Sequence, residues 1–268
     1  MLVASINTAV VRTAAAECTL GNGMLSNRSH ILLAVNNATT KSLPLQATGP
    51  WNNVEFSPLN NALITIDGKL YQVQNANRSW SLSSPNAHAL RFEVRSGDRW
   101  DEQDTERSEI AGETPYSPTV NVSYNFMLEP GPANVAAWLV VGQFHSNDNP
   151  TAAQPSHAPF AIYMNGEHME IDIASAATGS TAETGSVLYL DPKPIQRGRY
   201  YAITIEANFQ NNANGFLEVS RDGIQLVNYH CPIGFGQSVY WKEGIYRSPA
   251  NQTVAAAYQN TTLTVRQR

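Results

Sequence analysis

Three observations predict that this chain of 268 residues is an all-β protein, a β-jelly roll in which two antiparallel sheets form a sandwich and one sheet is concave. Apolar and polar residues alternate with a period of two along many segments. Turn dipeptides that contain glycine separate pairs of such segments. An amphipathic helical pattern never persists for more than about three turns.

Three hairpins are expected, over residues 63–73, 161–173 and 217–227. Their turns are Asp67-Gly68, Asn165-Gly166 and Asp222-Gly223, and such pairs suit the positive φ angles of type I′ turns. Longer strands are expected over residues 120–128 and 202–209, where apolar residues occupy every second position. This alternation is typical of strands with one buried face and one wet face.

Residues 50–268 are interpreted as one jelly-roll domain, and residues 1–49 as an N-terminal arm with the first strand or strands. The first 16 residues are apolar and end in three alanines, as a signal peptide would, but they lack a basic start and contain Arg12. Six Asn-x-Ser/Thr sequons are compatible with a secreted or extracellular protein.

Charge and composition exclude several classes of protein. With 17 Lys+Arg against 22 Asp+Glu, the net charge is −5, which argues against a nucleic-acid partner. The chain lacks an apolar run of about 18 residues, so a membrane partner is not expected. Cys18 and Cys231 allow one disulfide or two free thiols, and no zinc motif surrounds them. We expect a monomer without a required cofactor or metal.

Four predicted strands carry reactive side chains on the face opposite their apolar residues. These side chains are Arg91, Glu93 and Arg95; Arg107 and Glu109; Gln143 and His145; and Tyr240, Lys242 and Tyr246. If the four strands lie in the concave sheet, these faces converge on one groove. Gly244, between Lys242 and Tyr246, would leave room there for a sugar ring.

This mixture of groups suits the β-elimination of a uronic-acid polysaccharide. Arg107 and Gln143 could neutralise the C5 carboxylate and stabilise the developing enolate. His145, or an ionised Tyr246, could remove the C5 proton, and Tyr246 could protonate the departing O4. Lys242 or an arginine nearby would favour the ionised form of the phenol.

The sequence resembles the β-jelly-roll polysaccharide lyases in three motifs: Arg107-Ser-Glu-Ile, Gln143-Phe-His145 and Tyr240-Trp-Lys-Glu-Gly-Ile-Tyr-Arg247. Alginate lyases carry comparable strands. Residues 91–100 and the ending Lys242–Arg247 look more like the heparin-lyase-I-like family. The alginate-lyase motifs are incomplete, because Ala111 stands where a second arginine is expected and Arg247-Ser248 replaces Asn-Gln.

The resemblance implies a concave substrate-binding sheet that binds an anionic polysaccharide. It implies catalytic roles for Arg107, Gln143, His145, Lys242 and Tyr246. Substrate-binding residues are then expected to be Arg91, Arg95, Glu109, Tyr240 and Arg247.

Two other functions stay open at this stage. The same fold hosts non-catalytic carbohydrate-binding modules. A jelly-roll glycoside hydrolase would need two carboxylates, and Glu170 and Asp172 form an incomplete version of such a motif. Residues 145–150 also offer oxygen ligands for a structural calcium ion, although their spacing matches no EF-hand.

Overall fold

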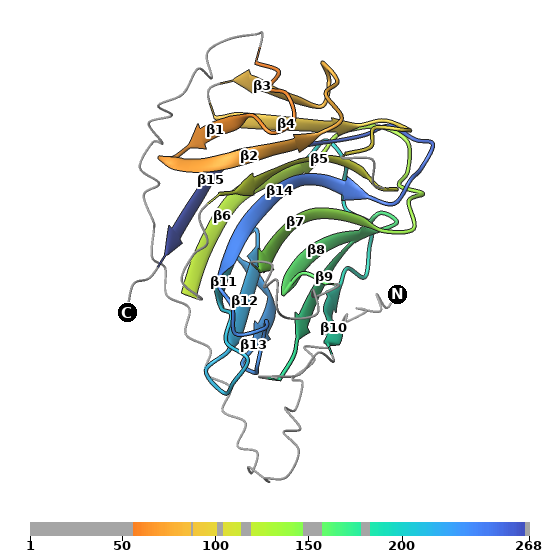
Figure 1. Ribbon diagram of the computed structural model, residues 1–268. Coiled ribbons are helices and arrows are strands. Elements are labelled where there is room, and N and C mark those ends of the chain that lie inside the picture. Colours follow the sequence, from red (N-terminus) through yellow and green to blue (C-terminus); the bar gives the residue numbers. More distant parts are fainter. Residues whose placement is uncertain are drawn as a thin grey trace, which may run out of the picture.

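The computed structural model describes residues 56–86, 88–100, 104–113, 119–146, 157–177 and 183–265. These residues form strands, turns and loops only, which confirms the all-β jelly roll (Figure 1). Helices long and apolar enough to cross a membrane are absent from the same residues. The predicted arm over 1–49, with its signal-peptide question, lies outside the described part of the chain.

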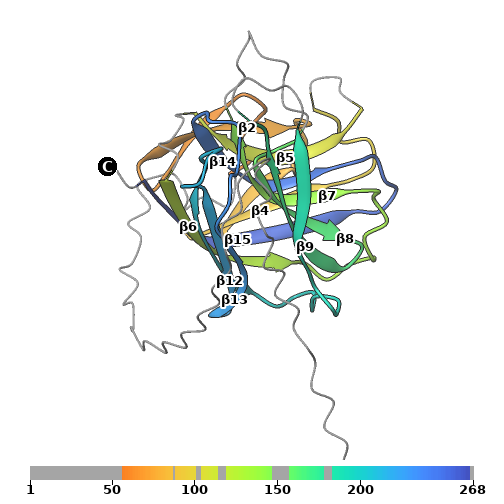
Figure 2. The same cartoon turned by 90° about the horizontal axis from the view of Figure 1, so that it is seen from below.

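The strands form two antiparallel sheets. In spatial order, the eight-stranded sheet contains β1 (Leu63–Ile66), β2 (Lys69–Asn75), β5 (Glu106–Gly112), β14 (Val239–Arg247), β7 (Leu139–Ser146), β8 (Phe160–Asn165), β9 (His168–Ser175) and β10 (Thr184–Leu190). The seven-stranded sheet contains β13 (Ile224–Tyr229), β12 (Phe216–Arg221), β11 (Tyr201–Asn208), β6 (Thr119–Leu128), β15 (Val254–Val265), β4 (Ala89–Val94) and β3 (Leu82–Asn86). The two layers are separated in the view from below (Figure 2).

The core fills the space between the sheets and follows the predicted alternation. Every second residue of β6, from Val120 to Leu128, is buried, and the residues between them are partly exposed. Trp241 from β14 packs against Phe144 from β7, with ring centroids 4.9 Å apart. Fully burying side chains of this size stabilises the fold by roughly 1.5–3 kcal/mol each. The same alternation leaves the other face of the eight-stranded sheet available for polar side chains.

All three predicted hairpins are present. The turns at Asp67-Gly68 and Asp222-Gly223 have positive φ at both residues, as a type I′ turn requires. The middle turn is shifted by one residue, because Asn165 pairs with His168 and leaves Gly166-Glu167 as the loop. Gly166 alone has positive φ there, at 58°. The prediction of an Asn165-Gly166 type I′ turn is therefore wrong in its register.

Strand β4 lies in the seven-stranded sheet, beside β15 and β3. Arg91 and Arg95 were expected to share one groove with the other reactive side chains, and that placement is wrong. Arg91 instead pairs with Glu93 and Glu129, at 2.7 and 2.8 Å. Arg95 lies 2.6 Å from Glu93 and stacks 3.9 Å from the ring centre of Trp80. The period of two gave the face of this strand correctly, but it carries no information about which sheet the strand joins.

Cys231 is buried and disulfide-bonded, which excludes the alternative of two free thiols. The second cysteine of the chain, Cys18, lies outside the described residues.

Candidate functional site

A polar cleft of about 760 Å³ lies on the outer face of the eight-stranded sheet, whose strands curve together in Figure 1. Six of the residues singled out from the sequence line this cleft: Arg107, Gln143, His145, Tyr240, Lys242 and Tyr246. They come from β5, β7 and β14, three neighbouring strands. The predicted convergence of these side chains is therefore present, while their chemical roles remain predictions.

The strand register explains the convergence. Strand β14 lies between β5 and β7, with Lys242 opposite Gln143 and Tyr240 opposite His145 on β7. On the other side, Tyr246 pairs with Arg107 of β5. Directly opposed residues on one face of an antiparallel pair have Cβ atoms about 4.5–5.5 Å apart. Residues far apart in sequence thus become immediate neighbours.

Gly244 has a different role from the one expected. Its φ is +133°, and a Cβ there would lie 2.7 Å from the Cα of Glu109 and 3.0 Å from the ring of Phe92. The absent side chain therefore makes room for β5 and the core rather than for a sugar. The pairing of β14 with β7 is also irregular between Glu243 and Tyr246. The irregularity shifts the register against β7, so that Tyr246 lies opposite Val140, which also lines the cleft.

Glu109 holds three of the cleft side chains from below. Its Oε1 accepts a hydrogen bond from Gln143 Nε2 at 2.9 Å, and its Oε2 lies 2.9 Å from Lys242 Nζ and 3.5 Å from Arg107 Nε. Burial alone would raise the pKa of Glu109, but Lys242 and Arg107 outweigh it and keep the pKa below its ordinary value. The carboxylate is therefore ionised at neutral pH.

The side chain of Glu109 is completely buried and does not line the cleft. Its predicted role as a substrate-binding residue is therefore wrong. A carboxylate under two cations and an amide fixes their positions, which is the orienting role that carboxylates often have toward arginine. The trio of Arg107, Lys242 and Glu109 keeps a net charge of 2 − 1 = +1 at the floor of the cleft.

Arg107 is held between two aromatic rings. Its guanidinium carbon lies 3.8 Å from the ring centre of Tyr246 and 4.5 Å from that of Trp100. Its Nη1 donates a hydrogen bond to Gln74 Oε1 at 2.8 Å. Tyr246 also contacts Trp138 in an edge-to-face arrangement, with ring centroids 4.7 Å apart. Stacking and hydrogen bonding together restrict the guanidinium to one orientation.

The contacts of His145 set its tautomer. Its Nδ1 lies 2.9 Å from the carbonyl oxygen of Ser146 and 3.2 Å from the hydroxyl of Tyr240. A carbonyl oxygen only accepts, so Nδ1 carries the proton in this contact. In the neutral imidazole, Nε2 is then the basic nitrogen.

The sequence interpretation missed several cleft residues. Gln74 and Trp100 line it beside Arg107, and Trp138 lines it beside Tyr246. Single glutamines and tryptophans carry no motif, so only the packing reveals them.

The far end of the cleft is acidic. Tyr163 of β8 and Asp172 of β9 line it, together with His157. Burial, with the neighbouring carboxylate of Glu170 as the second cause, raises the pKa of Asp172 to about 7. Burial also raises the pKa of Tyr163, and Asp172 adds to that effect. The sequence indicated Glu170 and Asp172 only as an incomplete hydrolase motif.

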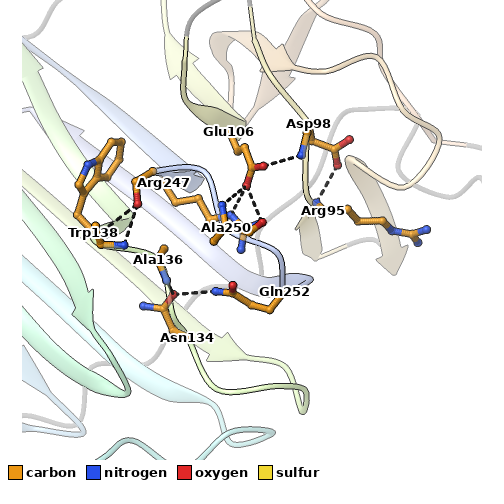
Figure 3. A network of polar contacts seen from close by, with 12 residues as sticks. Arg95, Asp98, Glu106, Asn134, Ala136, Trp138, Arg247, Ala250 and Gln252 are labelled. Carbon is orange, nitrogen blue, oxygen red and sulfur yellow. Dashed lines mark hydrogen bonds and ion pairs between the residues drawn. The ribbon is translucent and has the colours of Figure 1, made fainter.

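Arg247 cannot contact a ligand in the cleft, because its side chain is fully buried. Its Nε and Nη2 lie 2.7 and 2.6 Å from Glu106 Oε2. Figure 3 shows Arg247 and Glu106 in this contact. Glu106 Oε1 also accepts a hydrogen bond from the backbone of Gly97, at 2.6 Å. The predicted substrate contact of Arg247 is therefore wrong. The residue follows Tyr246 on β14 and points to the opposite face, as the period of two requires.

Groups of three or more histidine, cysteine or acidic side chains that could hold a metal ion do not occur among the described residues. The loop considered for calcium lies mostly outside them, since residues 147–156 are not described.

The fold is similar to that of several polysaccharide-cleaving enzymes. The endo-β-1,4-glucuronan lyase of the fungus Trichoderma reesei superposes with a TM-score of 0.57 at 8% identity, over 73% of this chain and 87% of that one. Alginate lyase A1-II′ gives a TM-score of 0.54 at 12% identity, over 73% and 94%. Alginate lyase PA1167 of Pseudomonas aeruginosa gives 0.51 at 15%, over 71% and 88%.

These structures show the shared fold. The closer resemblance to the heparin-lyase-I-like family stays a prediction. Comparison with curated proteins gives no significant match. The model of one sequence family, described as Polysaccharide lyase, matches residues 50–262. That match covers most of the chain and includes every cleft residue named above. The chain therefore belongs to the polysaccharide lyase family and is an enzyme of that class.

Proposed function

We propose that this enzyme cleaves a uronic-acid-containing polysaccharide by β-elimination and leaves a 4,5-unsaturated sugar at the new end. The main support for this proposal is that one cleft is lined by a guanidinium, an amide, an imidazole, an ammonium and a phenol. Membership of the polysaccharide lyase family supports the reaction type. The fold neighbours that act on glucuronan and alginate support a uronate substrate.

The substrate carboxylate would bind over Arg107 and Gln143. Both side chains are anchored from behind, by Gln74 and Glu109 respectively, so their remaining donors are already oriented. As the C5 proton leaves, charge moves onto the carboxylate oxygens. Donors fixed in advance stabilise that charge without reorganising, which is the main source of catalysis in reactions of this type. Lys242 adds a second positive charge at the same place.

His145 is the proposed base toward the C5 hydrogen. Its Nδ1 is oriented by Ser146 and Tyr240, which makes Nε2 the atom that takes the proton. Tyr246 then donates its hydroxyl proton to O4 as the C4–O4 bond breaks. An ionised Tyr246 is the alternative base toward the C5 hydrogen, and the guanidinium carbon of Arg107 lies 3.8 Å from the centre of its ring.

The test is a substrate panel of alginate, glucuronan, heparan sulfate and bacterial exopolysaccharides. Elimination creates a conjugated double bond, so ultraviolet absorbance should rise with at least one polymer. A hydrolase would instead raise reducing ends without absorbance. His145→Ala and Tyr246→Phe should each remove most of the activity. Folded variants that both keep it would overturn the assigned roles.

A polymeric substrate implies that the enzyme works outside the cell, since such chains do not cross membranes. We include an extracellular location in the proposal; the matched sequence family and the fold are compatible with it.

A further inference from the structure

The cleft does not end at the cationic cluster. Beyond Tyr163 and Asp172 it continues into a smaller hollow of about 190 Å³, which shares His157, Ala158, Tyr163 and Asp172 with the main cleft. The rest of this hollow is lined by small or apolar residues of β8, β9 and β10, such as Ala161 and Val187. A polysaccharide that crosses the cleft along the sheet therefore passes over Asp172 on its way from one space to the other.

We infer that Asp172 is a specificity-determining residue, which selects a sugar without a carboxylate for the position next to the uronate that is cleaved. The inference rests on the proposed function and assigns a substrate preference to the same cleft. A second uronate at this position would place its carboxylate against that of Asp172, with Glu170 next to Asp172 on β9. A neutral sugar would instead offer hydroxyl donors to the aspartate oxygens.

The surroundings of Asp172 provide little compensation for its charge. Arg107 and Lys242, the cations that line the cleft, both lie at its other end and are paired with Glu109. Of the residues that face Asp172, Glu170 is on the same strand and Tyr163 is on β8. A carboxylate that enters this end of the cleft therefore meets like charge, partly shielded from water.

Among the residues that the structure describes, His157 is the third titratable neighbour of Asp172. Its Nδ1 lies 3.0 Å from Glu183 Oε2, so any positive charge it carries is shared with a second carboxylate. From β10, the residue paired with Asp172 is Val187, which adds no charge. The net charge at this end of the cleft thus depends on whether Asp172 is protonated. The preference for a sugar without a carboxylate should therefore strengthen as pH rises through about 7.

The experiment compares Asp172→Asn with the wild-type enzyme on two kinds of polymer. Homopolymeric glucuronan carries a carboxylate on every sugar, whereas in hyaluronan and heparosan each uronate alternates with an uncharged N-acetylhexosamine. We expect Asp172→Asn to raise the rate on glucuronan relative to the alternating polymers by about tenfold at pH 8. In the wild type this ratio should fall as pH rises from 6 to 8, and in the variant it should stay level.

Two variants serve as comparisons. Glu170→Gln should change the ratio in the same direction but less, because Glu170 does not line the cleft. Glu218→Gln removes the same charge from β12 of the other sheet, where the side chain is 42% exposed, and should leave the ratio unchanged. Thermal unfolding confirms that each variant is folded.

Binding separates this inference from the proposed function. Calorimetry with uncleaved oligosaccharides of both kinds, in the Tyr246→Phe background, reports selection without turnover. If binding is selective and depends on Asp172 but the wild-type enzyme forms no unsaturated product, the proposed function alone is wrong. Elimination with a substrate ratio unaffected by Asp172→Asn would sink this inference alone. Failure to bind either kind would overturn both.

Discussion

The two ends of the cleft are built in opposite ways. At the end formed by β5, β7 and β14, the buried, ionised carboxylate of Glu109 lies under Arg107 and Lys242 and pairs with both. At the end formed by β8 and β9, Glu170 and Asp172 lie on one face, and among the described residues neither is paired with a lysine or an arginine; burial, with Glu170 as the second cause, raises the pKa of Asp172 to about 7. Ion pairs on a buried carboxylate give a rigid site, whereas a carboxyl group with a pKa of about 7 gives one that responds to pH.

Under the proposed function, the two ends have different tasks. Chemistry that develops negative charge needs donors and cations whose positions do not change during the reaction. Discrimination between substrates needs a repulsive element as well as an attractive one. Arg107, with its two stacked rings, fits the first task, and Asp172 fits the second. Four predictions test this division, beginning with the largest expected effect.

Tyr246→Phe should reduce the rate of elimination by about 10³-fold, because general acid catalysis typically contributes 10²–10⁴-fold. The ring that stacks on Arg107 is retained, so stability should change little. Initial rates from ultraviolet absorbance measure the effect. Tyr229→Phe on β13 is the matched control and should retain full activity. A Tyr246→Phe enzyme with more than a tenth of the wild-type rate would show that the cationic end does not work through this phenol.

Glu109→Gln should destabilise the protein by about 3 kcal/mol, since it leaves Arg107 and Lys242 buried without their counter-charge. Urea unfolding measures this change. The hydrogen bond to Gln143 can persist, so the variant is expected to fold. Activity should fall in the folded enzyme as well, with a lower kcat. A variant as stable as the wild type would mean that the pairing described for this end is not what holds it together.

Asp172→Asn should alter how stability depends on pH. The pKa of Asp172 is about 7 in the fold against an ordinary 3.8, so the folded state holds the proton more tightly than the unfolded chain. Stability contributed in this way is present at low pH and declines as pH rises from about 4 to about 7. Because the group is only half-buried, we expect a loss of about 1 kcal/mol across this window.

The asparagine variant should lack that decline, which thermal unfolding at several pH values can detect. Burial also raises the pKa of Glu243 in the core to about 7, but that residue is the same in both proteins. The difference between the two profiles therefore isolates Asp172. Superimposable profiles would mean that its carboxyl is not perturbed in the fold, and the contrast between the two ends would weaken.

The smallest effect is expected for Arg95→Gln. This arginine is 47% exposed and follows β4, in the sheet that does not carry the cleft. Elimination rates should change by less than twofold, and stability by under about 1 kcal/mol from the lost stacking on Trp80. A large drop in activity would mean that the substrate extends onto the second sheet.

Local patterns predicted much of this molecule. Alternation placed Lys242 and Tyr246 on one face, and turn dipeptides placed three hairpins. What they could not supply was the pairing of distant strands. That pairing decides that Arg91 lies on the other sheet and that Asp172 reaches the cleft. The sequence also did not indicate how deeply each side chain is buried. Glu109 and Arg247 are charged residues of the kind usually found on the surface, but both are buried here and form ion pairs.

The proposed elimination breaks the polysaccharide in the cleft without adding water. Mass spectrometry of the products from an active polymer tests this most directly. Each cut should yield one new end that is lighter by one water than the hydrolytic product, and the number of unsaturated ends should equal the number of new reducing ends. Products of full hydrolytic mass, formed by the wild type and abolished in Asp172→Asn, would contradict the proposed elimination and indicate a hydrolase.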